Sequence, residues 1–412
     1  MCNMSRASEI ANNVWLGPTP DSLLCPPSED DPEFDIFIEA NDLAQAPDAQ
    51  ALKRTGELSY SAPQHLEFPS SGSIMPQAHA KSKSDPLKIM CQWMHKLANS
   101  NTTPVASEDE DNDSEGDIPM KVLFPQSRKI LIHCTDGYTE STLLALAYFM
   151  FAEQIPIHEA WLRLHCEKKR NFFAYPTDVA LLASLQPRLI SDLPLTRGRI
   201  DSAREEPAWI SRIDGSLPSR ILPYLYLGNL GHANNPDLLK AMGIKRILSV
   251  GEPANWSKAQ IDSWGPKNLL FVDRVQDNGV DPLMKDFERC LDFIGEPVFS
   301  ITVRSKADIR TGRGKADASA TLVHCRVGVS RSATICIAEV MSSLGLSFPR
   351  AYCFVRARRL NVIIQPHLRF AYELLKWDEV CQQKRGEPVK RELEWATIAR
   401  EIAAMNKPYA SR

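Results

Sequence analysis

The chain has 412 residues, enough for two to three domains of ordinary size. Its composition, 43% hydrophobic and 24% charged with a formal net charge of −3, is that of a folded protein and lacks the basic excess of a chain that binds nucleic acid along its whole length. The apolar runs, such as "TLLALAYFMFA" at 142–152, are far shorter than the roughly 20 residues of a membrane span. We therefore expect no nucleic-acid partner and no membrane span.

The first half of the chain contains the elements of an α/β domain. The apolar runs "NVWLGP" at 13–18 and "KILI" at 129–132 predict buried strands, and the second leads into "HCTDGYTES" at 133–141. An apolar helix is predicted over 141–151. The acidic stretch "SEDEDNDSEGD" at 107–117, just before the strand that leads into this loop, can bury too little apolar surface to offset its chain entropy, so we expect a surface insertion at about 101–120.

The same order of elements returns in the second half. Strands are predicted from "YLYLGN" at 224–229 and "TLV" at 321–323, and the latter leads into "HCRVGVSRS" at 324–332. A helix then ends at Gly345, a residue typical of a helix C-cap. A basic stretch predicts a second surface insertion at about 298–320.

The repeated order predicts two copies of a whole α/β domain, each a central mixed sheet flanked by helices. We expect the first copy at 1–190, a polar linker at 191–215 and the second copy at 216–385. The remaining residues, 386–412, contain "RELEWATIAREIAAM" at 391–405, whose apolar spacing predicts a terminal helix before a tail.

The cysteines are ten in number and irregularly spaced, without the density of a secreted disulfide scaffold or the paired C-x-x-C pattern of a zinc site. The sequence opens without the charged and apolar regions of a secretory signal. These features predict free thiols in a reducing compartment, the cytoplasm or the nucleus.

The stretch 324–332 has the pattern of a loop that binds a phosphoryl group and attacks it. Five residues bent between a strand and a helix turn their N–H groups to one centre, and the helix adds its positive N-terminus. Gly328 permits backbone angles and a close approach that a side chain would block. Arg331 supplies a planar fork for two phosphoryl oxygens. These groups would lower the pKa of Cys325 and make it the nucleophile.

The other residues of this loop have supporting roles in the same hypothesis. His324 is expected to brace the loop by hydrogen bonding, and Ser332 to donate a hydrogen bond to the sulfur as it leaves. The walls of the substrate site are expected to consist of His324, Arg326, Val327, Gly328, Val329, Ser330 and Arg331. Cysteine chemistry of this kind requires no cofactor and no metal.

A leaving oxygen must also be protonated, which requires a general acid. The segment "LFVDRVQDNGVDP" at 270–282 offers Asp273, Asp277 and Asp281 in or beside a polar turn. Asp273 falls within the apolar strand register, and Asp281 with Pro282 marks the expected start of a helix, where it would act as the N-cap. Asp277 is therefore the preferred acid.

The second copy resembles the dual-specificity phosphatases of the cysteine-dependent protein tyrosine phosphatase superfamily. The resemblance rests on "VHCRVGVSRSAT" at 323–334, "YLYLGN" at 224–229, "DFERCLDFI" at 286–294 and "AYCFVRARR" at 351–359. In that family the acid lies ten residues before the phenylalanine of the third stretch, which implies Asp277. One departure is Gln365, where the family more often has asparagine before proline.

The tandem plan resembles fungal dual-specificity phosphatases whose first copy is inert and, more distantly, the two-domain cell-division-cycle phosphatases. The first loop carries Glu140 where the second carries Arg331, so the grip on a phosphoryl group is lost. In "LEFPSSGSIMP" at 66–76, serines stand near the position that corresponds to Asp277. We therefore expect Cys134 to be unreactive and the first copy to be a degenerate pseudophosphatase.

The predicted activity is hydrolysis of phosphotyrosine and phosphoserine or phosphothreonine in signalling proteins, with phosphoproteins as substrates and protein kinases as further partners. Two alternatives remain. A phosphoinositide or other non-protein phosphatase would be favoured by lysines inside the loop, and "RVGVS" has none. A phosphoprotein-binding adaptor fits the first copy better than the second, which retains the cysteine, the arginine and the acid.

Overall fold

The computed structural model describes residues 6–20, 32–57, 62–73, 86–100, 127–190, 206–295 and 319–388. These residues form two compact units. The first contains the described residues up to Trp161 together with 177–190, and the second contains Leu162–Pro176 and all described residues from 206 onward. The predicted acidic insertion, most of the linker and of the basic insertion, and the predicted terminal helix at 391–405 lie outside the described residues.

The first unit is built on a five-stranded sheet in the order β1-β2-β5-β3-β4. Only the pair β1–β2 is antiparallel. The strands are β1 (Ser8–Ala11), β2 (Val14–Pro18), β3 (Ile36–Asn41), β4 (Gln64–Pro69) and β5 (Ile130–Cys134). The helices are α1 (Ala49–Glu57), α3 (Pro86–Ala98), α4 (Thr142–Glu153), α5 (Ile157–Cys166), whose residues from Leu162 group with the second unit, and α6 (Pro176–Leu189).

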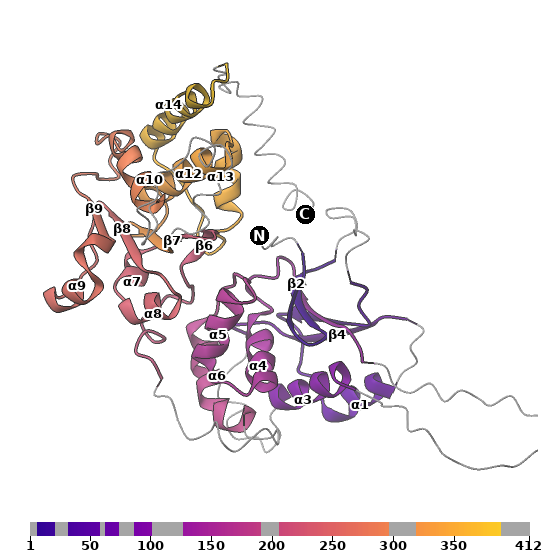
Figure 1. Ribbon diagram of the computed structural model, residues 1–412. Coiled ribbons are helices and arrows are strands. Elements are labelled where there is room, and N and C mark those ends of the chain that lie inside the picture. Colours follow the sequence, from indigo (N-terminus) through magenta and orange to yellow (C-terminus); the bar gives the residue numbers. More distant parts are fainter. Residues whose placement is uncertain are drawn as a thin grey trace, which may run out of the picture. The chain divides into compact units, whose positions relative to one another are not determined.

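The second unit has a sheet in the order β6-β7-β10-β8-β9, again with one antiparallel pair, β6–β7. Its strands are β6 (Ser219–Leu222), β7 (Leu225–Gly228), β8 (Arg246–Val250), β9 (Leu269–Val272) and β10 (Thr321–His324). Its α-helices are α7 (Leu230–Ala233), α8 (Pro236–Ala241), α9 (Lys258–Trp264), α10 (Phe287–Gly295), α12 (Arg331–Leu344), α13 (Phe348–Arg356) and α14 (Leu368–Arg385), with short 3-10 turns η1 (Pro266–Asn268) and η2 (Met284–Asp286). In Figure 1, α10, α12, α13 and α14 lie on one side of this sheet and α7, α8 and α9 on the other.

The two sheets have the same strand order and the same strand directions, which confirms the predicted mixed α/β sheets flanked by helices. In each sheet the central strand, β5 or β10, is parallel to both of its neighbours. Because the carboxyl ends of parallel strands meet at one edge, the loop after the central strand lies at the usual ligand-binding edge of such a sheet. The helix after the second loop ends as predicted, since Gly345 has a left-handed φ of 65° at the C-cap of α12.

The core of the second unit lies between its sheet and the helices α10, α12, α13 and α14. Helix α12 is buried at every position from Arg331 to Met341, so it is the central helix of this layer. Phe287 of α10 is fully buried and meets Trp377 of α14 edge to face at 5.5 Å. This packing sets the position of α10 and therefore of the polar turn that precedes it.

The segment Leu162–Pro176 is an integral part of the second unit, although it precedes the linker. The amide of Asn171 donates a hydrogen bond to the carbonyl of Arg358 at 2.7 Å, and Ala174 N–H donates to the carbonyl of Gly215 at 2.8 Å. Gly215 has a φ of 98°, and a side chain there would lie 2.7 Å from the ring of Phe173. The close approach of this segment therefore requires glycine at 215.

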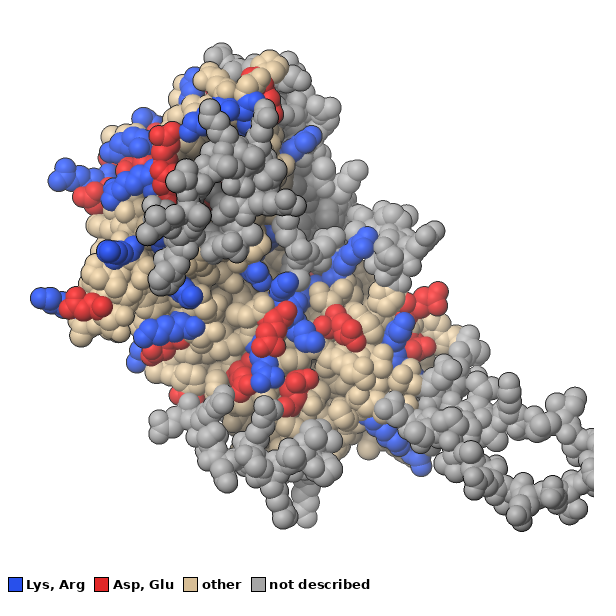
Figure 2. Space-filling view, viewed as in Figure 1, with Lys and Arg blue, Asp and Glu red and all other residues tan. Residues whose placement is uncertain are grey.

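On the face shown in Figure 2, basic and acidic side chains of the described residues are interspersed rather than gathered by sign. That distribution agrees with the near-neutral net charge of −3. Among the described helices, none is by itself long and apolar enough to cross a membrane, and α12 and α13 reach that threshold only when taken together across a bend of 117°.

Candidate active site

Cys325 lies at the point where β10 ends and the loop to α12 begins. It is buried, with 3% of its surface exposed. Its sulfur accepts a hydrogen bond from the N–H of Gly328 at 3.2 Å and another from the hydroxyl of Ser332 at 3.1 Å. Gly328 has the positive φ, 77°, that turns the backbone N–H back toward the sulfur. The sequence-predicted residues Cys325, Gly328 and Ser332 therefore meet at one centre.

The ionisation of Cys325 is the outcome of two opposing effects. Burial alone would raise the pKa of the thiol, because a thiolate is poorly solvated in the protein interior. The hydroxyl and backbone N–H of Ser332, the N–H of Gly328 and the charge of Arg331 favour the thiolate and together hold the pKa of Cys325 below its ordinary value. The loop therefore favours the thiolate form of a buried cysteine.

Arg331 opens α12, and its guanidinium points toward the loops that follow β8 and β9. One terminal nitrogen donates to the carbonyl of Val275 at 3.3 Å, and the other lies 3.9 Å from a carboxylate oxygen of Glu252. The Nε atom is buried and has no hydrogen-bond partner among the described residues. One donor of the arginine is thus available to an oxygen of a bound group.

Of the three candidate acids, Asp277 is the one that contacts the loop. Its carboxylate accepts a hydrogen bond from the hydroxyl of Ser330 at 2.8 Å, and that hydroxyl in turn accepts the N–H of His367 at 3.0 Å. Asp273 lies just past β9, where it pairs with Arg274 at 3.6 Å on the surface. Asp277 is exposed, so it can reach an oxygen of a bound substrate.

The predicted helix start at Asp281 is wrong. Asp281 instead accepts the backbone N–H of Gln276 at 3.1 Å and so closes the turn that carries Asp277. The helix begins later, at η2 and α10, because the N–H groups of Leu283 and Met284 both donate to the buried carboxylate of Glu373 at 2.8 Å. Glu373 lies on α14, far away in the sequence, so the local pattern could not indicate its role.

His324 lies beneath the loop and contacts both the neighbouring strand and the loop backbone. It is fully buried, and its Nε2 atom lies 2.7 Å from the hydroxyl of Ser249, while Nδ1 lies 3.4 Å from the carbonyl of Cys325. The pKa of His324 is lowered to about 4, mainly by burial. The charge of Arg331 also lowers this pKa, whereas the hydrogen bond with the Cys325 carbonyl raises it. The lowered pKa favours the neutral imidazole at physiological pH.

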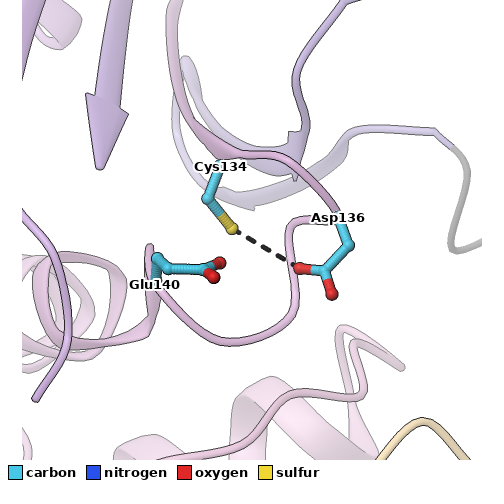
Figure 3. A group of neighbouring side chains, drawn as sticks. All are labelled: Cys134, Asp136 and Glu140. Atoms are coloured by element: carbon cyan, nitrogen blue, oxygen red, sulfur yellow. Dashed lines mark hydrogen bonds between the residues drawn. The ribbon is translucent and has the colours of Figure 1, made fainter. Parts of the chain in front are cut away.

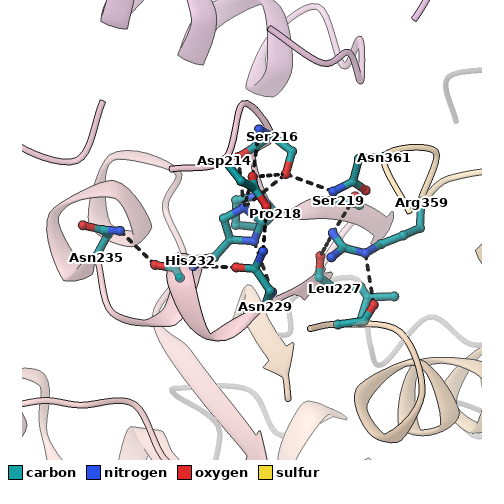
Figure 4. A network of polar contacts seen from close by, with 12 residues as sticks. Asp214, Ser216, Pro218, Ser219, Leu227, Asn229, His232, Asn235, Arg359 and Asn361 are labelled. Atoms are coloured by element: carbon teal, nitrogen blue, oxygen red, sulfur yellow. Dashed lines mark hydrogen bonds and ion pairs between the residues drawn. The ribbon is translucent and has the colours of Figure 1, made fainter. Parts of the chain in front are cut away.

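A second brace, which sequence reasoning missed, comes from Arg359. This side chain is fully buried; its Nε donates to the carbonyl of Gly328 at 3.3 Å and one terminal nitrogen donates to the carbonyl of Leu227 at 3.1 Å. Figure 4 shows Arg359 beside a polar network in which Asn361 and His232 both contact Ser216. Nothing in the local sequence distinguishes Arg359 from its neighbour Arg358.

The remaining wall residues line the rim of the loop. Arg326 and Val327 are exposed, and the carbonyl of Arg326 accepts the N–H of Leu230 at 3.1 Å. The carbonyl of Val329 accepts the N–H of Gln365 at 2.9 Å. This contact uses the backbone, and residue 365 is exposed, so the departure from asparagine leaves the loop supported.

The loop of the first unit has the same backbone turn but carries acidic side chains, whereas the second loop carries basic ones. Gly137 has a φ of 64°, like Gly328, and Cys134 is 2% exposed at the end of β5. Burial raises the pKa of the Cys134 thiol, and the carboxylates of Glu140 and Asp136 raise it further, against the lowering effect of a hydrogen bond with Ser141. Figure 3 shows the thiol of Cys134 and the carboxylates of Asp136 and Glu140 directed toward one another.

The serines expected in place of the acid hold the first loop together instead. The N–H of Ser71 donates to the carbonyl of Glu140 at 2.8 Å, and its hydroxyl accepts the N–H of Leu143 at the same distance. The neighbouring Gly72 N–H donates to Asp178, and burial raises the pKa of that carboxyl group to about 6. The one carboxylate of the described residues 66–73 is Glu67, which lies within β4 rather than in the turn after it.

The sheet order and the loop between central strand and central helix define the class of the second unit, a phosphatase-like α/β domain with a cysteine at the anion site. Residues 225–380 match the family model for the dual specificity phosphatase catalytic domain. These residues therefore belong to the dual specificity phosphatase family, as the resemblance predicted. The degenerate character of the first copy stays a prediction.

Several known proteins are similar to the chain. Dual specificity protein phosphatase PPS1 of Saccharomyces cerevisiae is 33% identical over 366 residues, which cover 70% of this chain and 42% of that protein. Dual specificity protein phosphatase 1 of Homo sapiens is 31% identical over 212 residues, 50% of this chain and 51% of that protein. The chain thus spans about half the length of these relatives. The solved structure of human DUSP28 is 25% identical over 40% of this chain and 99% of that chain, with a TM-score of 0.30.

The turn at Gly328 gives a first prediction. A side chain there would lie 2.4 Å from the carbonyl oxygen of Gly228 and 2.6 Å from a terminal nitrogen of Arg359, so Gly328→Ala should displace the loop. Gly345→Ala is the matched control, because Gly345 has a similar φ of 65° but nothing within 4 Å. We expect Gly328→Ala to weaken vanadate binding at least ~100-fold by calorimetry, and Gly345→Ala to cost only about 1 kcal/mol of stability. Equal vanadate affinity in both variants would refute the assigned role of this turn.

The two loop cysteines give a second prediction. Cys325 and Cys134 are 3% and 2% exposed, so a difference in alkylation would report ionisation rather than access. The pKa of Cys325 is lowered and that of Cys134 is raised, so at the same pH Cys325 has the larger thiolate fraction. We expect iodoacetamide to label Cys325 at least ~10-fold faster by peptide mass spectrometry, and Ser332→Ala to reduce the difference. Similar rates for both thiols would contradict the assignment.

Proposed function

We propose that the second unit hydrolyses phosphotyrosine and phosphoserine or phosphothreonine in proteins through a phosphocysteine at Cys325. The observation that carries the proposal is the buried sulfur with a lowered pKa, facing loop N–H groups beside an arginine with a free Nε donor. Membership of residues 225–380 in the dual specificity phosphatase family and the names of the relatives support it.

In the first step, the thiolate of Cys325 attacks phosphorus, and the bond from phosphorus to the leaving oxygen breaks. Asp277 donates its proton to that oxygen, while Arg331 and the loop N–H groups hold the phosphoryl oxygens. In the second step, the carboxylate of Asp277 takes a proton from water, the water oxygen attacks phosphorus, and the sulfur leaves as a thiolate. The hydrogen bond from Ser332 stabilises the leaving sulfur, and inorganic phosphate is released.

The proposed site residues thus have separate tasks. Cys325 is the nucleophile, Arg331 binds the transferred group, and Asp277 moves protons. His324 and Ser330 hold the loop from below and from the side, and their contacts with Ser249 and Asp277 support these roles. Gly328 supplies an N–H to the sulfur, and Arg326, Val327 and Val329 form the walls around the bound phosphoryl group.

The proposed substrates are phosphoproteins, with protein kinases as further partners. The cysteines that the structure describes are all free thiols, which supports a reducing compartment, the cytoplasm or the nucleus. We propose that the first copy, 1–190, has no phosphatase activity. The carboxylate of Glu140 stands in the sequence position of Arg331 and repels a phosphoryl dianion, and the raised pKa of Cys134 keeps its thiol protonated.

The proposed plan of the chain keeps a linker at 191–215, the catalytic copy at 216–385 and a terminal segment at 386–412. Because Leu162–Pro176 is part of the second unit, tests of activity should use the full chain.

A third prediction tests the function itself. The full chain should dephosphorylate peptides that carry phosphotyrosine or phosphothreonine, and Cys325→Ser should abolish turnover while it keeps vanadate binding. Cys353→Ser is the control, because Cys353 is a free thiol of α13 outside the loop. Turnover of phosphoinositide vesicles alone would favour the non-protein phosphatase, and peptide binding without turnover by the unmodified chain would favour an adaptor.

A fourth prediction separates the candidate acids. Asp277→Ala should lower kcat for alkyl phosphoesters by about 10²–10⁴, the usual contribution of a general acid, and much less for aryl esters with good leaving groups. Asp273→Ala should leave both unchanged, because Asp273 only pairs with Arg274 on the surface. The assignment fails if Asp277→Ala slows both ester classes equally, or if Asp273→Ala gives the selective loss.

A further inference from the structure

The first loop gathers three side chains that commonly bind metal ions. The sulfur of Cys134 and carboxylate oxygens of Asp136 and Glu140 all lie within 4.8 Å of one another. The sulfur is 3.6 Å from Oδ1 of Asp136, and Figure 3 shows the Glu140 carboxylate directed toward the same sulfur. We propose that this loop is a binding site for a thiophilic divalent cation, with Zn²⁺ as the ion that fits it best.

The distances suit tetrahedral zinc. A Zn–S bond of about 2.3 Å and a Zn–O bond of about 2.0 Å at a tetrahedral angle place sulfur and oxygen about 3.5 Å apart. The separation of 3.6 Å between Cys134 and Asp136 corresponds to this edge without movement of either side chain. Glu140 can complete a third vertex, and the exposed end of the loop at Asp136 leaves the fourth position to water.

The charges of the two loops are reversed at matching positions. The second loop carries a formal +2 from Arg326 and Arg331, and the first has Thr135 and Glu140 at these positions. The first loop also has Asp136 at the position of Val327. The first loop therefore carries −2 from Asp136 and Glu140, a difference of four charges on a backbone with the same positive-φ glycine. A simple loss of phosphate binding would need only the loss of the arginine. The paired carboxylates beside a thiol make the site attractive to a cation.

An unpaired oxygen gives independent support. The Oε2 atom of Glu140 is buried from solvent and has no hydrogen-bond partner among the described residues. Glu140 as a residue is half-buried, but a carboxylate oxygen shielded from solvent without a hydrogen bond is costly, and a metal ion bound between it and the sulfur would remove that cost. The carboxylate faces the position where the ion would lie.

Two effects oppose binding. The N–H of Tyr138 donates to Oδ1 of Asp136 at 2.8 Å, and this is the oxygen that lies 3.6 Å from the sulfur, so it would have to share its lone pairs between that N–H and the ion. The thiol of Cys134 must also lose its proton: Cys–SH and M²⁺ give a Cys–S–M bond and one released proton. Affinity should therefore rise about tenfold per pH unit while the free thiol stays protonated.

Cobalt provides a direct test, because a thiolate bound to Co²⁺ gives a charge-transfer absorption band in the near ultraviolet. The full chain with Cys325→Ser, which removes the other loop thiol, should develop this band with one Co²⁺ per chain, and Zn²⁺ should displace it. Cys134→Ser should abolish the band. Cys166→Ser is the matched control, because Cys166 is a free thiol of α5 outside the loop.

Carboxylate variants test the rest of the site. Glu140→Gln keeps the shape and should weaken Zn²⁺ on the order of tenfold, while Glu140→Arg, the residue of the second loop, should abolish binding. Circular dichroism checks that each variant is folded. A second measurement uses the unmodified loop: at pH 8, bound Zn²⁺ should protect Cys134 from alkylation by iodoacetamide. A chain that develops no thiolate band, or that keeps it after Cys134→Ser or Glu140→Arg, overturns the proposal. Neither outcome bears on catalysis at Cys325.

Discussion

The backbone turn at Gly328 is the constraint on which the second unit depends. It directs one N–H to the sulfur of Cys325 while its carbonyl accepts the buried guanidinium of Arg359. Gly228 lies so close on the other side that no side chain would fit. The turn is thus held from strand β7, from the end of α13 and from the sulfur itself, and the stabilisation of the thiolate follows from this fixed geometry rather than from exposure to solvent.

The same turn explains how distant segments become one site. Ser330 links the loop to Asp277 on one side and to the start of α14 on the other, so this carboxylate is positioned by the loop that carries Cys325. Glu373 of α14 accepts two backbone N–H groups at the end of the turn that carries Asp277. Cys325 and Asp277 therefore share supports, and a change in α14 would alter the position of both.

The sequence could predict those features that are local. Apolar runs located the central strands, the spacing of Cys325, Gly328, Arg331 and Ser332 located the loop, and the same order of elements in both halves predicted two similar sheets. Other features depend on contacts between residues far apart in the chain. The brace from Arg359 spans 31 residues to Gly328, and the bond from Leu283 to Glu373 spans 90, so neither leaves a local pattern. The helix start was wrongly predicted at Asp281 for the same reason, because the distant carboxylate of Glu373 binds the N–H groups of Leu283 and Met284 and helix α10 begins after them.

The segment Leu162–Pro176 has a consequence for how such a chain can change over generations. A gene for the second copy alone would begin after this segment and would omit the side chain of Asn171 that supports Arg358, next to the brace Arg359. Part of the downstream unit is thus encoded within the upstream half of the chain, so the two halves cannot be separated at the linker without loss of structure from the second.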